Sequence, residues 1–141
     1  MDTCEFCNQI ALKEQIILRN KTILLLYPHS PIIPEHLIII PVRHIGSFEN
    51  LNETEILEIH KIVNKILKFF RKKEKISGFN LFSNVGEKAG QHIPHFHWHL
   101  FIRLENEKIS PYKILNNPKL KEKLTKKEWL KRKNRIIKTL S

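Results

Sequence analysis

The chain has 141 residues, of which 41% are hydrophobic, and a formal net charge of +11 at pH 7. Its length suits one domain, with or without an appendage, and its apolar share is enough for a core. The longest unbroken apolar runs, such as residues 37–40, are far too short to cross a bilayer, which argues against a membrane-spanning protein. No secretory signal is visible at the N-terminus, so we expect a cytoplasmic protein with reduced thiols.

The positive charge is concentrated near the C-terminus. Residues 112–141 hold eleven of the 25 Lys and Arg residues but only two of the 14 Asp and Glu residues. We expect residues 105–141 to form a basic helical extension. One interpretation is a contact for nucleic acid or polyphosphate, and the preferred one is a solvated amphipathic helix packed on the sheet or on a dimer partner.

The first half of the chain is predicted to combine short strands with one long helix. Residues 15–20 and 22–27, rich in leucine and β-branched residues, are predicted to form a hairpin. Three prolines make residues 28–34 an extended loop, and the most hydrophobic run, 36–42, is predicted to be a central strand. From residue 52 or 54, apolar residues recur at spacings of three and four, which predicts an amphipathic helix of about five turns.

The second half is predicted to contain two strands followed by two helices. Gly78 is expected to end the helical segment, and the strands are predicted at 79–83 and 96–103. Pro118 opens the first helix, and the capping-box spacing of Thr125 and Glu128 opens the second. The second helix has an apolar side made of Trp129, Leu130, Ile136, Ile137 and Leu140.

Histidine is concentrated in one short stretch, because four of the eight histidines lie in residues 92–99. From His95 onward, histidine alternates with a large apolar residue, which is the pattern of a half-buried strand. His95, His97 and His99 should therefore share one face, while Phe96 and Trp98 pack into the core. Neighbouring histidines on such a strand lie about 6.6 Å apart, a spacing that suits groups gathered around one phosphate or one metal ion.

This row of histidines has the chemistry of nucleophilic catalysis at phosphorus. A neutral imidazole is a good nucleophile near pH 7, and its attack divides one difficult displacement into two easier steps. The developing charge needs positive groups and N–H dipoles, which flanking imidazoles can supply. The loop before the row can add backbone N–H groups at residues 90–93 and side-chain amides at Asn84 and Gln91, and Gly90 permits close approach to a phosphate.

Three motifs carry a resemblance to a known family. They are Asn84-x-Gly86-x-x-x-Gly90-Gln91-x-Ile93-x-His95-Phe96-His97-Trp98-His99-Leu100, Cys4-x-x-Cys7, and Pro34-Glu35-His36-Leu37-Ile38-Ile39-Ile40-Pro41-x-x-His44-Ile45. Residues 1–104 resemble the histidine triad (HIT) proteins, a superfamily of nucleotidyl hydrolases and transferases that act on the α-phosphate of a nucleotide. The resemblance implies an α+β fold with an antiparallel sheet of about five strands, one long helix and several short ones. It also implies a homodimer in which two sheets join.

The resemblance further implies roles for individual residues. His97 would be the nucleophile, and His99 would contact the phosphate and stabilise its charge. The other substrate-binding residues would contact phosphate or ribose through side-chain amides or backbone N–H groups: Asn84, Gly90, Gln91, His92 and Ile93. The substrate would be a purine nucleotide conjugate, and the chemistry itself would require no cofactor.

The N-terminal Cys4-x-x-Cys7 is half of a zinc site and is a weak signal alone. Structural zinc needs four nitrogen or sulfur ligands, and His44 and His95 are the natural completers. Zinc-bearing HIT proteins resemble this chain at all four positions, which implies a structural Zn²⁺ that fastens the N-terminus to the catalytic segment. The alternative is two ordinary buried thiols, with His44 as an acid–base relay near the site.

Several positions depart from the family pattern or lie outside it. Many HIT proteins place an acidic residue that holds the ribose hydroxyls after the second strand, where this chain has Pro28. His92 is either an extra donor to the leaving group or simply an exposed residue. His29 and His60 are interpreted as surface histidines, and His36 as a residue that satisfies a loop contact rather than one that takes part in chemistry.

Three functions agree with these residues. The preferred one is hydrolysis of nucleoside phosphoramidates or dinucleoside polyphosphates through a covalent nucleotidyl-His97 intermediate. A second is a nucleotide-binding adaptor with little turnover, which Pro28 and His92 motivate. A third is removal of adenylate from the 5′ end of a nucleic acid with help from the basic C-terminal segment.

Overall fold

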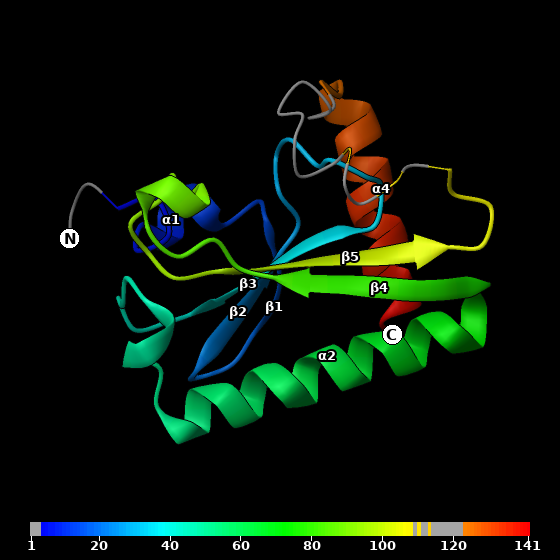
Figure 1. Ribbon diagram of the computed structural model, residues 1–141. Helices are drawn as coiled ribbons and strands as arrows, with labels where there is room; N and C mark the ends of the chain where they lie inside the picture. The colour runs from blue at the N-terminus through cyan, green and yellow to red at the C-terminus, as the bar shows by residue number, and fades with distance from the viewer. Residues whose placement is uncertain (1–3, 109, 111–112, 114–122) are drawn as a thin grey trace.

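The computed structural model describes residues 4–108, 110, 113 and 123–141, and contains a five-stranded antiparallel sheet in the order β1-β2-β3-β5-β4 (Figure 1). The strands are β1 (Ile16–Arg19), β2 (Ile23–Leu26), β3 (His36–Pro41), β4 (Ile76–Phe82) and β5 (Trp98–Leu104). The helices are α1 (Gln9–Leu12), α2 (Glu53–Lys73) and α4 (Lys126–Thr139), with short 3-10 turns η1 (Phe48–Asn50) and η2 (Glu87–Ala89). The predicted α+β fold is confirmed, while the homodimer stays a prediction.

The central strand β3 is buried on both faces. Its residues alternate between two hydrophobic clusters, with Leu37 and Ile39 in the cluster that includes α2 and Ile38 and Ile40 in the cluster on the opposite face. Because β2 and β5 flank this strand, both of its edges are paired. Burial on both faces explains the unbroken apolar run in the sequence. The predicted hairpin of β1 and β2 is also confirmed.

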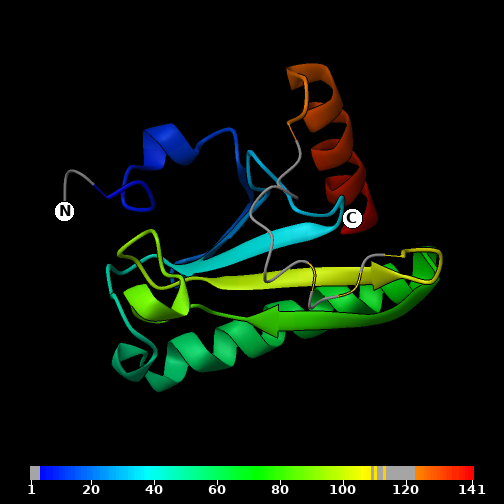
Figure 2. The ribbon, with the colours of Figure 1, turned by 45° about the horizontal axis from the view of Figure 1, so that its top comes forward.

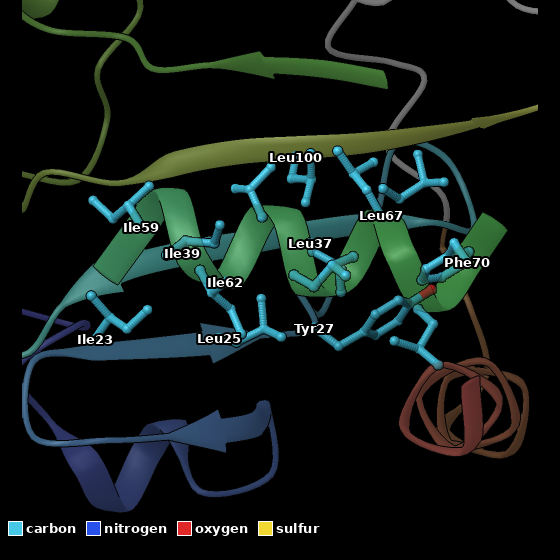
Figure 3. Packing of buried hydrophobic residues seen from close by; sticks show 14 of the residues in the cluster. Ile23, Leu25, Tyr27, Leu37, Ile39, Ile59, Ile62, Leu67, Phe70 and Leu100 are labelled. Carbon is cyan, nitrogen blue, oxygen red and sulfur yellow. The ribbon is translucent and has the colours of Figure 1, made fainter. Parts of the chain in front are cut away.

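The long helix α2 follows the amphipathic pattern of its sequence. Asn52 caps its N-terminus, where the side-chain oxygen accepts the backbone N–H of Glu55 at 2.8 Å. Its buried side packs across the sheet, as Figure 3 shows for Ile59, Leu67 and Phe70. The hydrophobic effect of covering this face holds the helix in place.

The connection after α2 differs from the prediction. The helix ends at Lys73, because Glu74 takes an extended conformation, and β4 begins at Ile76 rather than at residue 79. Gly78 therefore lies inside β4, at a register shift between Ile76 and Gly78, and it does not end the helix. An isolated glycine within a strand suits such a bulge.

The last strand begins later than predicted. Residues 95–97 form an irregular segment, and pairing with β3 starts at Trp98, which lies opposite Ile39. The two predicted faces are nevertheless present within β5. His99, opposite Ile38, lies on the face away from α2, and Leu100 packs into the cluster that includes α2.

The C-terminal helix α4 begins with the predicted capping box, in which Thr125 and Glu128 satisfy each other's backbone N–H groups. Trp129 and Ile136 join the same hydrophobic cluster as α2. Two residues predicted on its apolar side are instead 39% exposed, because α4 presents only a narrow stripe to the core: Leu130 and Ile137.

Two expectations about the C-terminal part stay open. The helix predicted to begin at Pro118 lies outside the described residues. The boundary between a domain of residues 1–104 and an extension of residues 105–141 stays a prediction, although α4 shares the core of the sheet. Within the described part of the chain, no helix is long and apolar enough to span a bilayer.

Replacing Phe70 by Ala should lower the free energy of unfolding by about 3–5 kcal/mol, because the fully buried ring leaves a cavity in the main cluster. Leu57→Ala, on the exposed side of the same helix, should change it by no more than about 0.5 kcal/mol. Urea unfolding followed by circular dichroism measures both values. Equal losses for the two variants would contradict the placement of α2.

Candidate active site

The three histidines of the row gather on the face of the sheet away from α2. His95 and His97 lie just before β5, and His99 lies within it. The ring centroids of His97 and His99 are 5.0 Å apart. The ring of Phe6, from the N-terminal segment, packs 5.8 Å from that of His95 and 5.2 Å from that of His97. Strand alternation alone therefore does not place the three histidines. The irregular segment of residues 95–97 and the ring of Phe6 also position them.

The ring of His97 has a defined orientation. Its Nδ1 lies 2.8 Å from the backbone oxygen of His95, so Nδ1–H donates to this carbonyl and the lone pair of the neutral ring is on Nε2. Burial, with 7% of the residue exposed, lowers the pKa of His97. The charge of His92 lowers this pKa further, and the hydrogen bond to the His95 oxygen opposes both effects. A neutral ring with its lone pair on Nε2 has the form that a nucleophile requires.

The ring of His99 is oriented from the neighbouring strand. The backbone N–H of Ile32 donates to Nδ1 of His36 at 3.2 Å, so the proton of a neutral His36 is on Nε2. This Nε2–H donates to Nδ1 of His99 at 2.9 Å, which places the proton of His99 on Nε2. His99 is thereby set as a hydrogen-bond donor through Nε2, the form that can contact a phosphate oxygen.

The pairing of His36 with His99 is absent from the sequence-based expectations. His36 does satisfy a loop contact at Ile32, as expected, but its other ring nitrogen meets a residue 63 positions later. The sequence feature that could have predicted this pairing is a histidine at the first position of the most hydrophobic strand. A buried polar ring in that place needs hydrogen-bond partners on both nitrogens.

A cavity of about 380 Å³ has His36 and His99 in its wall, and His97 lies next to His99 but outside the residues that line it. The N-terminal segment contributes Phe6, and the loop between β2 and β3 contributes Pro28 and His29. A concave site with apolar walls and a few polar groups suits a nucleoside.

The predicted substrate-binding residues fall into two groups. His92, Ile93 and His99 line the cavity, and His92 is exposed there. The rest lie on the preceding loop, outside the cavity wall as the described residues define it: Asn84, Gly90 and Gln91.

The loop before the row has a defined shape. Gly90 has a φ of +96°, a left-handed conformation that favours glycine. The side-chain oxygen of Gln91 accepts the N–H of Gly86 at 2.9 Å, and its Nε2 donates to the backbone oxygens of Gly46 and Ile93 at 3.0 and 3.1 Å. Gln91 therefore holds the loop against the segment after β3, and its contact with a substrate stays a prediction.

The N-terminal cysteines meet two histidines beside the row. The ligand atoms of Cys4, Cys7, His44 and His95 all lie within 4.8 Å of one another. The Sγ atom of Cys7 is 3.1 Å from Nδ1 of His44, and both sulfurs are 3.6 Å from Nδ1 of His95. Bonds of about 2.0–2.3 Å around a tetrahedral zinc place neighbouring donors about 3.6 Å apart. The four predicted ligands thus have separations that fit a tetrahedral metal.

His95 connects this cluster to the row. Its Nε2–H donates to the backbone oxygen of Pro41 at 2.9 Å, which leaves the Nδ1 lone pair facing the sulfurs. The ring is fully buried, and burial lowers the pKa of His95, which favours the neutral form that binds metals. Its backbone oxygen meanwhile accepts the hydrogen bond from His97.

The remaining histidines differ in their surroundings. His29 and His60 are both exposed, as expected. His29, however, lines the cavity, and its ring centroid lies 5.2 Å from that of Trp129 in α4. The exposed ring of His29 therefore packs against the buried indole of Trp129.

Comparison with known proteins assigns most of the chain to one family. Residues 9–106 match the HIT domain family. The chain belongs to the HIT family. It is 29% identical over 99 residues to an uncharacterised HIT-like protein of Saccharolobus solfataricus, and the match covers 69% of this chain and 71% of the relative. It is 26% identical over 98 residues to the asymmetrical bis(5'-nucleosyl)-tetraphosphatase of Schizosaccharomyces pombe, covering 70% of this chain and 54% of that protein.

Solved structures of other HIT proteins share the fold over nearly the whole chain. A hypothetical histidine triad nucleotide-binding protein from Sulfolobus tokodaii superposes with a TM-score of 0.77 at 22% identity, covering 97% of this chain and 91% of that one. A Zn-bound histidine triad family protein from Mycobacterium smegmatis has a TM-score of 0.72 at 18% identity, with coverages of 99% and 96%. At these identities the likeness concerns the fold alone.

We expect a neutral His97 to carry its proton on Nδ1, and neutral His36 and His99 to carry theirs on Nε2, because their hydrogen-bond partners require these tautomers. Long-range ¹H–¹⁵N correlation spectra of the imidazole groups distinguish the two tautomers. The exposed His92 serves as the reference, because we expect its signals to average over both tautomers. A proton on Nε2 of His97 would contradict the ring orientation.

Proposed function

We propose that this protein is a nucleotide hydrolase or transferase that breaks the bond to the α-phosphate of a nucleotide conjugate. The observation that carries the proposal is the hydrogen bond of 2.8 Å from Nδ1 of His97 to the backbone oxygen of His95. It puts the lone pair on Nε2, where it can attack phosphorus. Membership of the HIT family supports the same chemistry.

In this proposal His97 is the nucleophile. Its Nε2 forms a bond to the α-phosphorus while the bond from phosphorus to the leaving nitrogen or oxygen breaks. The leaving group departs with the electron pair and takes up a proton. Water then attacks the same phosphorus and releases its proton to solvent, the bond to Nε2 breaks, and a nucleoside monophosphate leaves. Another acceptor in place of water gives group transfer.

Two neighbours stabilise the charges that develop in these steps. The tautomer of His99 that carries its proton on Nε2 can donate to the phosphoryl oxygens, and the hydrogen bond from His36 favours that tautomer. Once Nε2 of His97 is bound to phosphorus, the ring is positively charged, and the carbonyl of His95 on Nδ1–H stabilises this charge. Both interactions gain strength where water is excluded.

The proposed substrate is a conjugate of a purine nucleoside monophosphate, with either a P–N or a P–O–P bond to be broken. The S. pombe relative is named for a substrate of the second class, which supports that class here. The cavity of about 380 Å³ is the proposed nucleoside site. Its wall carries Pro28 at the position where many HIT proteins have an acidic residue for the ribose hydroxyls. The polar residues of the wall that can meet the ribose instead include Glu5, His29 and Ser30.

His97→Ala should reduce turnover of diadenosine tetraphosphate and adenosine 5′-phosphoramidate by at least about 10³-fold, because the group that forms the covalent bond is lost. Chromatographic measurement of released AMP gives the rates. His60→Ala, an exposed histidine on α2, is the matched control and should keep the wild-type rate. Wild-type turnover by the His97 variant would rule out this mechanism.

We also propose that Cys4, Cys7, His44 and His95 hold a structural zinc ion. The separations of the four donor atoms support this, and so does the Zn-bound protein of M. smegmatis with a similar fold. Four protein ligands close the coordination sphere, so a bound ion would contribute folding free energy rather than a step of the reaction. It would also fasten Phe6, which lies between the two cysteines, against the row.

The purified protein should contain about one zinc ion per chain, since one closed four-ligand site binds one ion. Cys7→Ser should lose the metal and lower the Tm by at least about 4 °C, because binding energy at such a site is folding energy. Elemental analysis and thermal unfolding measure the two effects, with the exposed His92→Ala as control. Unchanged metal content and Tm in Cys7→Ser would argue for ordinary thiols.

A further inference from the structure

The loop between β2 and β3, residues 27–35, has different neighbours on its two sides. One side lines the cavity, with Pro28, His29 and Ser30 in its wall. The other side meets α4, which lies beside the loop in both Figure 1 and Figure 2. The loop therefore connects the C-terminal helix to the proposed nucleoside site.

Trp129 attaches α4 to the start of this loop. Its Nε1–H donates to the backbone oxygen of Pro28 at 2.8 Å, and the residue is only 5% exposed. The indole centroid lies 5.8 Å from the ring of Tyr27 and 5.2 Å from that of His29. Because a buried N–H is disfavoured without a hydrogen-bond partner, this hydrogen bond fixes the position of Pro28 against α4.

Arg135 attaches α4 to the end of the loop. Its guanidinium forms an ion pair with Glu35, whose side chain is 4% exposed, and a second ion pair of 2.8 Å with Glu74. A buried carboxylate is strongly disfavoured without such a partner. Glu35 directly precedes His36, and its backbone oxygen accepts the N–H of Ile102 in β5. The ion pair thus holds the chain at the point where it enters β3.

Ile32 transmits this restraint from the loop to the histidines. It lies between the two attachment points, and its N–H sets the tautomer of His36. His36 in turn orients His99. A partner that holds the second nitrogen of an imidazole controls what the first nitrogen can do. Movement of the loop would release that control.

We propose that α4 is a positioning element of the nucleotide site, acting through Trp129 and Arg135 on the loop of residues 27–35. The inference rests on the proposed function. Neither residue touches the reacting atoms, and both act through the cavity wall and the hydrogen bond between His36 and His99. The nucleophile His97 is held by the backbone of its own segment. Releasing Pro28 at the start of the loop therefore weakens nucleotide binding more than it slows the step at His97. Releasing Glu35 at the end of the loop also disturbs the pairing of His36 with His99 and lowers kcat.

The positive charge of α4 suggests a different role, an electrostatic contact with a nucleic acid or a phosphate. The two roles depend on different residues of the helix. Lys127 and Lys131 are exposed, whereas Trp129 is buried and Arg135 is engaged with two carboxylates. Neutralising an exposed lysine changes the charge and leaves the attachment of the loop intact.

The test compares Trp129→Phe, which keeps an aromatic ring without the N–H, with the control Lys131→Gln. Calorimetry with AMP gives Kd, and turnover of diadenosine tetraphosphate gives kcat and KM. Trp129→Phe should raise Kd and KM about 3–10-fold, the effect of one lost hydrogen bond, with kcat within about twofold of wild type. Lys131→Gln should leave all three values unchanged.

Arg135 provides a second variant with a rescue. Arg135→Gln leaves the buried Glu35 without its cation, so it should raise Kd and shift the imidazole ¹⁵N signals of His36 and His99. Arg135→Lys restores the charge and should return both readouts toward the wild-type values. Circular dichroism shows whether each variant is folded.

Unchanged Kd, KM and imidazole signals in folded Trp129→Phe and Arg135→Gln would overturn the inference, and so would a lower kcat at constant Kd. Loss of folding in both variants without rescue by Arg135→Lys would overturn it too, because α4 would then serve the fold as a whole. A wild-type protein without AMP binding or turnover would defeat the proposed function instead. The imidazole signals alone would then decide whether α4 orients His36 and His99.

Discussion

The antiparallel pairing of β3 with β5 is the constraint on which the proposed nucleotide site and the cluster of Cys4, Cys7, His44 and His95 both depend. Its register puts Ile38 opposite His99, so that His36 and His99 come within hydrogen-bond distance although they are 63 residues apart. The ladder begins only at Trp98, and the irregular segment before it brings His95 to the far end of β3. Because a slip of one residue would exchange the two faces of β5, this register is strongly specified by burial.

His95 makes the two sites mechanically dependent on each other. Its ring is held between the cysteine sulfurs on one nitrogen and the oxygen of Pro41 on the other. Its backbone oxygen accepts the hydrogen bond from Nδ1–H of His97. Phe6, between the two cysteines, packs on the rings of both histidines. A change that moves the cluster of Cys4, Cys7, His44 and His95 would therefore also move the carbonyl that orients His97.

The strongly basic composition describes the C-terminal segment more than the site. Most of the net charge lies in residues 112–141, yet the two residues of α4 that meet the loop are a buried indole and an arginine paired with carboxylates. The contribution of α4 to the cavity is thus one of shape and hydrogen bonding. The helix α4 packs on the sheet, which is one of the arrangements that we preferred from the sequence. It also contacts the loop of residues 27–35, whose other side lines the cavity.

The sequence by itself determined the features that depend on neighbours along the chain. The spacing of apolar residues predicts α2, and the pair Thr125 and Glu128 predicts the start of α4. The histidine row indicates the HIT family, which the match over residues 9–106 confirms. Only the tertiary structure decided which partners these residues meet. Gly78 lies inside β4, the row joins its strand only at Trp98, and His36 pairs with His99. These outcomes depend on strand register and on the path of the loops. Contacts between residues far apart in the chain stabilise both, so local periodicity does not predict them.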